Sequence, residues 1–155
     1  MTREKVQEFT LRITRANSTQ LVVVLYDMTL SYLEDALQAE SKEDFAQSLR
    51  KVRGCLNELL ASVRPGSEMA ENFGKLYFFF LRHLAKALRG HDKEMVAQIV
   101  PLIQKLRDAY EESTKDNAEG PLMANAQDVY AGFTYGKTAQ ASELSDQTSG
   151  RGMFV

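Results

Sequence analysis

Two histidines and one cysteine are the side chains of this chain best suited to metal binding or nucleophilic chemistry. A di-iron centre inside a helical bundle needs a Glu three residues before a His, because that spacing places both ligands on one face of a helix. Phe80 and Leu88 occupy that position before His83 and His91, so neither histidine meets the requirement. We expect both histidines to be surface or packing residues. The sequence predicts no catalytic residue, no metal site and no cofactor.

Cys55 is the only cysteine, which rules out an internal disulfide and a thiolate metal cluster. Val52, Leu56 and Leu59 flank it at helical spacing, a pattern typical of a thiol that is buried or lines a groove. We therefore interpret it as a packing residue rather than a nucleophile. A single thiol suits a reducing compartment, and the N-terminus lacks an apolar secretory leader, so we expect a cytoplasmic protein.

Charge and hydropathy argue against two classes of partner. The 155 residues include 19 basic and 21 acidic side chains, with both signs mixed along the chain, so we do not expect a nucleic acid partner. The longest apolar runs, at 21–26 and 76–81, are far shorter than the roughly 20 residues that a membrane-spanning helix needs. We expect no membrane span.

Four segments carry apolar residues every three or four positions, the spacing of an amphipathic helix. These helices are expected from Ser18 to about Ala39, from Ser41 to about Arg64, from Ser67 to Gly90, and from Asp92 to about Ser113. The links between them are only a few residues long, so successive helices must pack as antiparallel neighbours. The sequence predicts an all-α protein, an antiparallel up-down four-helix bundle over residues 18–113. Pro101 predicts a kink in the last helix.

The two ends of the chain differ from the bundle in composition. Residues 1–17 are polar with scattered apolar positions, and we expect a flexible N-terminal arm that packs locally. Residues 114–155 hold five of the nine glycines and are expected to form a C-terminal tail. After Pro121, apolar residues recur at steps of three and four, which predicts one short helix within the tail. They are Leu122, Met123, Ala126, Val129, Tyr130 and Phe133.

The first and third predicted helices carry more apolar residues than one buried stripe requires. Their expected core rows are Leu21, Leu25, Met28 and Tyr32 in the first helix and Phe73, Leu76, Phe80 and Leu84 in the third. The remaining apolar residues either pack beneath the arm and tail or line a groove for the amphipathic helix of a partner. The candidate partner-binding residues, on these two helices and on the second, are Val22, Tyr26, Leu33, Val52, Cys55, Tyr77, Phe78, Phe79 and Leu81.

Three segments match motifs of one known family in order and spacing. Residues 21–27 (Leu-Val-Val-Val-Leu-Tyr-Asp), 71–84 and 106–110 (Leu-Arg-Asp-Ala-Tyr) resemble segments of the FliS family of flagellin-specific export chaperones. The family patterns are Leu-Tyr-Asp-Gly after aliphatic residues, then Asn-Leu-x-x-Leu-Tyr-x-Tyr-Met-x-x-x-Leu, and finally Leu-Arg-x-Ala-Trp. This chain departs from them with Met28 for glycine, Phe78 and Phe80 for tyrosine and methionine, and Tyr110 for tryptophan.

The resemblance implies a cytosolic chaperone whose apolar helical grooves bind the disordered C-terminal segment of flagellin. Binding would prevent premature polymerisation and support delivery to the flagellar export apparatus. The resemblance also implies that the N-terminal arm covers part of the binding surface until flagellin displaces it. We place the residues that would compete with flagellin in both ends of the chain, at Phe9, Ile13, Met123, Val129, Tyr130 and Phe133.

The sequence is compatible with two other interpretations of the apolar groove. A regulatory adaptor or anti-sigma-type protein would use the same groove for another amphipathic helix. A homodimer would join two copies through the apolar faces of the first and third predicted helices. The identity of the molecule that occupies the groove distinguishes the three.

Overall fold

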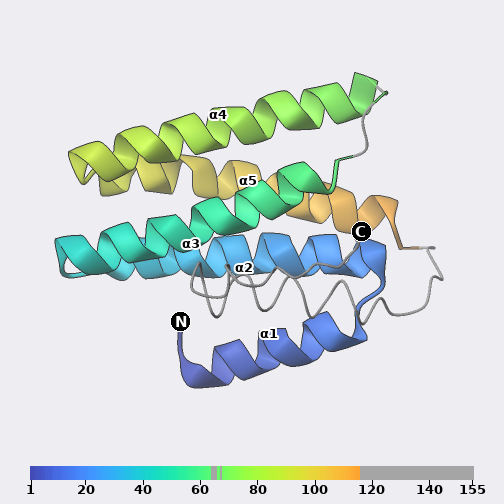
Figure 1. Ribbon diagram of the computed structural model, residues 1–155, viewed down its shortest axis with the longest axis horizontal. Coiled ribbons are helices and arrows are strands. Elements are labelled where there is room, and N and C mark those ends of the chain that lie inside the picture. The colour runs from blue at the N-terminus through green and yellow to red at the C-terminus, as the bar shows by residue number, and fades with distance from the viewer. Residues whose placement is uncertain (64–65, 67, 116–155) are drawn as a thin grey trace, which may run out of the picture.

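The computed structural model describes residues 1–63, 66 and 68–115, and five helices lie within these residues. They are α1 (Arg3–Arg15), α2 (Ser18–Gln38), α3 (Lys42–Ala61), α4 (Glu68–Gly90) and α5 (Lys93–Ser113) (Figure 1). Helices α2 to α5 form the predicted antiparallel bundle, with α2 packed against α3 and α5, and α4 against the same two helices. The all-α prediction is confirmed. The predicted tail lies almost wholly outside the described residues.

Side-chain caps explain where the bundle helices begin. The predicted caps Ser41 and Asp92 are confirmed, because the side chain of each accepts a backbone N–H in the first turn of its helix. Helix α2 is capped by Asn17 rather than by Ser18. The Asn17 side chain accepts the Gln20 N–H at 2.8 Å, and the Gln20 side chain accepts the Asn17 N–H at 3.1 Å. This reciprocal capping box fixes the turn between α1 and α2.

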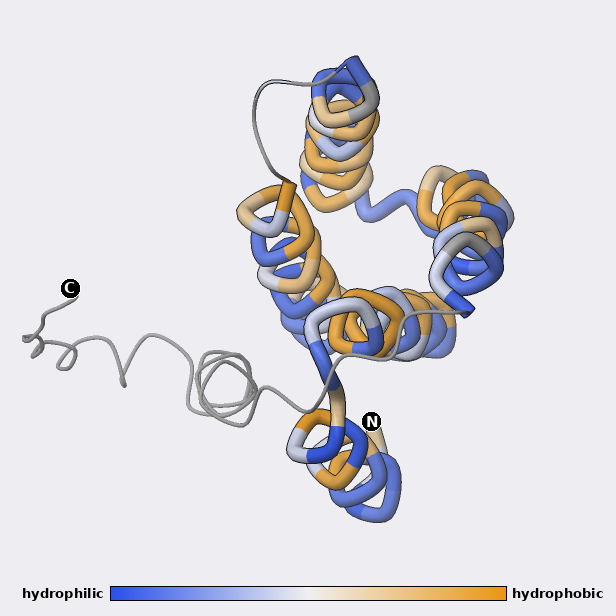
Figure 2. Tube along the Cα trace, turned by 90° about the vertical axis from the view of Figure 1, so that its right-hand side faces the viewer, coloured by the Kyte–Doolittle hydropathy of each residue, from blue (hydrophilic) through white to orange (hydrophobic). Residues whose placement is uncertain are grey.

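The N-terminal segment is more ordered than the sequence predicts. A flexible arm was expected over 1–17, but residues 3–15 form α1, which lies outside the bundle beside α2 (Figure 2). Phe9 and Ile13, four residues apart, are buried. The expectation of local packing is therefore confirmed and that of a flexible arm is wrong. A helix this short gains little stability from its own sequence, so the surface of α2 must stabilise it.

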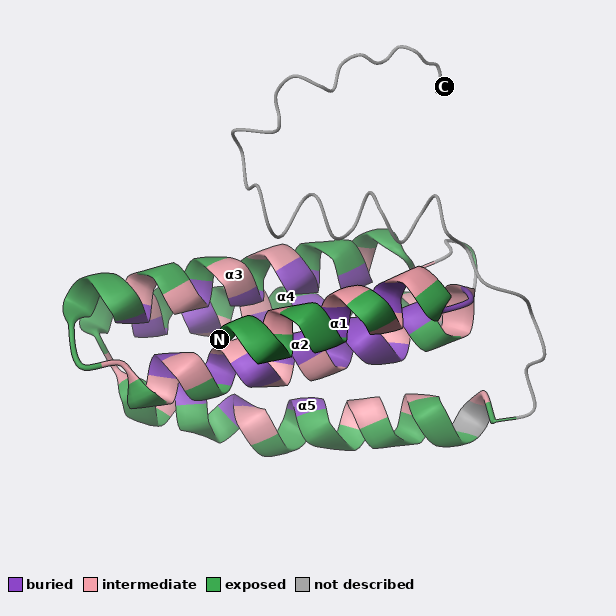
Figure 3. Cartoon of the chain, turned by 90° about the horizontal axis from the view of Figure 1, so that it is seen from below, coloured by how far each residue is buried: buried purple, intermediate pink, exposed green. Residues whose placement is uncertain are grey.

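Helix α2 is buried on nearly all sides because it lies between the bundle core and α1. Figure 3 shows α1 lying over α2 with exposed residues on its outer side. The covering explains why α2 needs apolar residues around most of its circumference. The buried positions of α2 are Leu21, Val23, Val24, Leu25, Tyr26, Met28, Thr29, Ser31, Leu33 and Ala36.

Two helix breakers lie inside helices. Helix α5 continues past Pro101, whose side chain is exposed. Gly74 of α4 is half-buried, and a Cβ added there would meet only the Leu60 side chain, at 4.0 Å. That distance is ordinary van der Waals contact, so close helix packing does not require a glycine at this position. None of the described helices is long and apolar enough to cross a membrane.

Candidate partner-binding surface

Three tyrosines from the three sequence motifs meet in the bundle, and of these Tyr26 and Tyr77 are buried and Tyr110 is half-buried. The Tyr26 hydroxyl of α2 hydrogen-bonds to the Tyr77 hydroxyl of α4. The Tyr110 ring of α5 lies 6.3 Å from the Tyr26 ring, measured between centroids. Burial raises the pKa of both Tyr26 and Tyr77, because the charged phenolate is poorly solvated there. Tyr26 and Tyr77 therefore stay neutral, and the three rings join α2, α4 and α5.

Asp27, next to Tyr26, links three helices by ion pairs. Arg107 of α5 approaches it with Nε at 2.8 Å from Oδ1, and Arg12 of α1 with Nη2 at 2.6 Å from Oδ2. The hydrogen bonds to Asp27 raise the pKa of Arg107, which stays protonated. A third ion pair, between the Met1 ammonium and Asp35 at 2.6 Å, holds the start of α1. These pairs fix α1 antiparallel to α2.

The solvent-facing side of α4 carries two exposed aromatic rings among basic residues. Phe78 and Phe79 are 53% and 41% exposed, among the most exposed large apolar residues that the structure describes. Residues 72–90 contain no Asp or Glu. The basic residues of this stretch are all exposed: Lys75, Arg82, Lys86 and Arg89. The sequence-based prediction that charges of both signs are mixed everywhere is wrong for this helix face, which we call the α4 face.

A groove between α3 and α4 borders this face. Its volume is about 170 Å³, and Leu49, Leu81, Leu84 and Leu88 supply most of its apolar lining. Arg50, Arg53 and Arg89 also line the groove, and all three are exposed at its edges. An apolar floor with a basic rim suits an amphipathic segment that carries acidic side chains on its polar face.

Comparison with known proteins identifies the family. Residues 2–117 match the family described as Flagellar protein FliS, and the match covers well over half of the chain. The chain belongs to the FliS family. Flagellar secretion chaperone FliS of Bacillus subtilis (strain 168) is 24% identical over 104 residues, which cover 65% of this chain and 78% of that protein. The resemblance of the three motifs is confirmed, and the motif residues Tyr26, Asp27, Tyr77, Arg107 and Tyr110 meet at helix contacts of this FliS-family fold.

Five of the nine predicted partner-binding residues lie in the core. The sequence left open whether these residues pack inside the protein or line a groove, and they lie inside, because α2 packs against α1, α3 and α5 while α4 packs against α3 and α5; they therefore form no accessible surface. Burial raises the pKa of the Cys55 thiol to about 12, so it is also a poor nucleophile. Each of the five is at most 3% exposed: Tyr26, Leu33, Val52, Cys55 and Tyr77.

The other four predicted residues are accessible to different degrees. Phe78 and Phe79 lie on the α4 face, and half-buried Leu81 connects that face to the α3–α4 groove. Val22 of α2 is half-buried. The α3 side of the groove was missed. The sequence indicates this side only through Arg50 and Arg53, which are three residues apart and therefore lie on one side of a helix.

The two histidines were expected to be surface or packing residues, and His83 is half-buried while His91 is exposed. His83 Nε2 lies 2.8 Å from the Met95 carbonyl oxygen, which accepts the ring N–H. His91, with a φ of 55°, places its ring 4.9 Å from the Phe45 ring. Among the described residues, no group of three His, Cys, Asp or Glu side chains is arranged to hold a metal ion.

Replacing Asp27 with alanine should loosen α1 more than any other helix. The change leaves Arg12 and Arg107 without their shared carboxylate, and we expect a loss of about 1–3 kcal/mol in the free energy of unfolding. Amide exchange in α1 should rise more than exchange in α3, which rises only as far as global unfolding becomes easier. Glu43→Ala is the matched control, because Glu43 pairs with Arg50 on the exposed surface and should contribute less than about 1 kcal/mol. Equal effects of the two substitutions would contradict the proposed link.

Proposed function

We propose that this FliS-family protein is a cytosolic chaperone for flagellar secretion and that its client is the C-terminal segment of flagellin. The observation that carries the proposal is the α4 face, where Phe78 and Phe79 are exposed beside an apolar groove. Solvent exposure of two neighbouring large rings is unfavourable unless a partner covers them. Membership of the family and the name of the Bacillus subtilis relative support a role in flagellar secretion.

Binding alone accounts for such a function. A flagellin segment that packs helix against helix in the filament would associate too early in the cytosol unless its apolar stripe were covered. A disordered segment that folds on binding gives up conformational entropy, which keeps its affinity moderate for the area it buries. Moderate affinity allows the client to be handed over to the flagellar export apparatus.

The charge of the α4 face narrows the chemistry of the client. Lys75, Arg82, Lys86 and Arg89 surround the exposed rings, and Arg50 and Arg53 stand across the groove. A bound segment would therefore present acidic side chains beside its apolar stripe. Such contacts raise the association rate and weaken with added salt.

Helix α1 supplies a second surface under this proposal. It covers α2 through the buried side chains of Phe9 and Ile13 and the ion pairs to Asp27 and Asp35. Because these contacts are few, a longer client segment could displace α1 and cover α2 in its place. This matches what the family resemblance implies for the N-terminal arm.

Titration calorimetry with a flagellin C-terminal peptide tests the proposal. We expect saturable 1:1 binding with a negative heat capacity change, because apolar surface is buried. A scrambled peptide of the same composition is the control, and light scattering before and after titration detects a homodimer. Absence of binding, or equal binding of the scrambled peptide, would contradict the proposal. Stronger binding of an unrelated amphipathic helix would favour an adaptor or anti-sigma-type function instead.

A further inference from the structure

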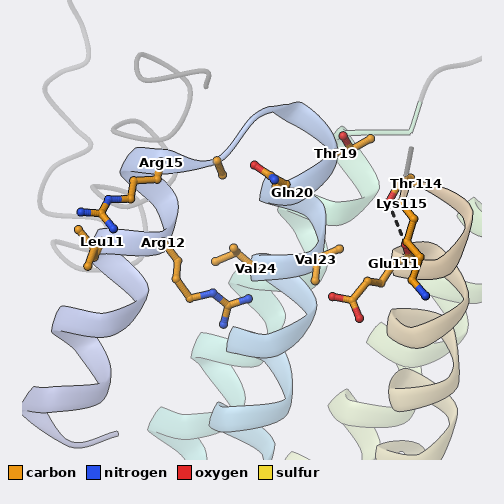
Figure 4. Close-up of a pocket in the computed structure, with 11 residues that line it drawn as sticks. Leu11, Arg12, Arg15, Thr19, Gln20, Val23, Val24, Glu111, Thr114 and Lys115 are labelled. Atoms are coloured by element: carbon orange, nitrogen blue, oxygen red, sulfur yellow. Dashed lines mark hydrogen bonds between the residues drawn. The ribbon is translucent and has the colours of Figure 1, made fainter. Parts of the chain in front are cut away.

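A cleft lies between α1, α2 and the end of α5 (Figure 4). Its volume is about 490 Å³, nearly three times that of the α3–α4 groove. Helix α1 contributes Leu11 and Arg15, α2 contributes Val23 and Val24, α5 contributes Glu111, and Thr114 and Lys115 follow α5 directly. The cleft is thus walled on one side by α1, the helix with the fewest contacts to the rest of the protein.

The walls of the cleft combine apolar and charged groups, including one carboxylate, that of Glu111, which is paired with Arg107. Leu11 is 49% exposed, although it belongs to a helix whose neighbouring apolar residues are buried. Arg15 is also exposed, and Arg12 lies on the same wall with its guanidinium paired to Asp27. A ligand for this site would cover Leu11 with apolar side chains and carry an acidic group toward Arg15, because the Arg12 charge is already paired.

The last residue that the structure describes lies at this cleft. Lys115 lines the cleft, and 40 further residues follow it, since the chain ends at residue 155. The segment 116–120 can span at most about 17 Å when extended, so residues that follow Pro121 begin within a short reach of the cleft. The tether gives them an effective concentration on the order of millimolar at nearby surfaces.

The composition of this segment complements the cleft. Residues 116–136 contain three acidic residues, Asp116, Glu119 and Asp128, and no Lys or Arg. The apolar residues from Leu122 to Phe133 recur at helical spacing and would form one stripe. The match to the FliS family ends at residue 117, so this stripe lies beyond the matched region.

We propose that residues 121–133 dock in the cleft of their own chain and hold α1 against α2. Met123, Val129, Tyr130 and Phe133 would cover Leu11 and the adjoining part of α2, while Asp116 and Glu119 of the linker would lie near Arg15 and Asp128 would face solvent. The docked segment adds a second support to α1 and so opposes its displacement. This inference does not rest on the flagellin proposal, because both tests below are made without flagellin.

Disulfide trapping in the full-length chain tests the contact directly. Leu11→Cys combined with Met123→Cys should form an intramolecular disulfide under mild oxidation, at least tenfold faster than Arg53→Cys combined with Met123→Cys. The Arg53 position is exposed in the α3–α4 groove and serves as the matched control. Native Cys55 is fully buried and should not compete. Equal rates for the two pairs, or disulfides formed only between two chains, would overturn the proposal.

Hydrogen exchange provides the second test. In the full-length chain, replacing both Val129 and Tyr130 with Asp should raise amide exchange in α1 several-fold and leave α4 unchanged. Ser142→Asp is the control, because it adds an acidic group to the tail outside the apolar stripe. If α1 exchanges at the same rate in all three proteins, the segment does not support α1 and the proposal fails.

Discussion

Replacing Tyr26 with aspartate should unfold the bundle rather than remove a surface contact. Tyr26 is 1% exposed, its hydroxyl is paired with that of Tyr77, and its ring lies against that of Tyr110. Aspartate would lose the ring contacts and place a carboxylate where it is poorly solvated. We expect a loss above about 4 kcal/mol in the free energy of unfolding, measured by thermal or urea denaturation followed by circular dichroism.

Tyr26→Phe is the matched control for this prediction. It keeps the ring and removes only the hydroxyl, which leaves the Tyr77 hydroxyl without its partner inside the bundle. We expect a smaller loss of about 1–3 kcal/mol and a fully helical spectrum. A Tyr26→Asp protein that melts at the wild-type temperature would show that Tyr26 is accessible in solution and that its place in the core is wrong.

The sequence predicted the bundle because its signals were local. Apolar residues at three- and four-residue steps located α2 to α5, and Ser41 and Asp92 marked two helix starts. Short links then required antiparallel packing. Pro101 was compatible with this reading, since α5 continues through it with the ring on the exposed side.

The burial of α2 could not be predicted in the same way. Both Tyr26 and Tyr32 lie on a helix that is apolar almost all round, and the sequence favoured Tyr32 for the core. In the structure Tyr32 is half-buried and Tyr26 is buried. The face that points inward depends on α1, and α1 has only Phe9 and Ile13 as buried anchors. A helix held by two side chains gives too weak a periodicity to be recognised.

The contacts between the motif residues also could not be predicted from the sequence. Asp27 and Arg107 are 80 residues apart, and no local pattern pairs them. Their presence in two motifs of one family was the only signal that they matter. In the structure these two residues have a role in folding, because their ion pair joins α2 to α5 and Asp27 also pairs with Arg12 of α1.

The candidate site was predicted best where the helix face stays uncovered. Phe78 and Phe79 were assigned to a partner surface, and the structure leaves both exposed. Tyr77 precedes them but faces the core, because successive residues on a helix point about 100° apart. Separating these neighbours required the position of α4 against α3 and α5, which the sequence pattern leaves open when every residue from 76 to 81 is apolar.

Replacing Phe78 with aspartate should abolish most flagellin-peptide binding while the protein stays folded. Phe78 is the most exposed of the large apolar residues described, so the substitution removes little from the core. Central aromatic residues of interfaces commonly contribute 2 kcal/mol or more, which corresponds to a loss of about 30-fold or greater in affinity. Calorimetric titration gives the affinity, and a melting curve confirms that stability changes by less than about 0.5 kcal/mol.

Leu102→Asp is the matched control for Phe78→Asp. Leu102 is 43% exposed on α5, so its substitution also exchanges an exposed apolar side chain for a carboxylate. It lies outside the α4 face and the α3–α4 groove, and we expect the affinity of the Leu102→Asp variant to remain within about threefold of the wild type.

If both variants bind normally, the client does not use the α4 face. If both lose binding equally, net charge rather than the exposed ring controls the affinity, because each variant adds one negative charge to a chain that already carries a net charge of −2. Loss in Phe78→Asp alone would place the client against the aromatic and basic side of α4.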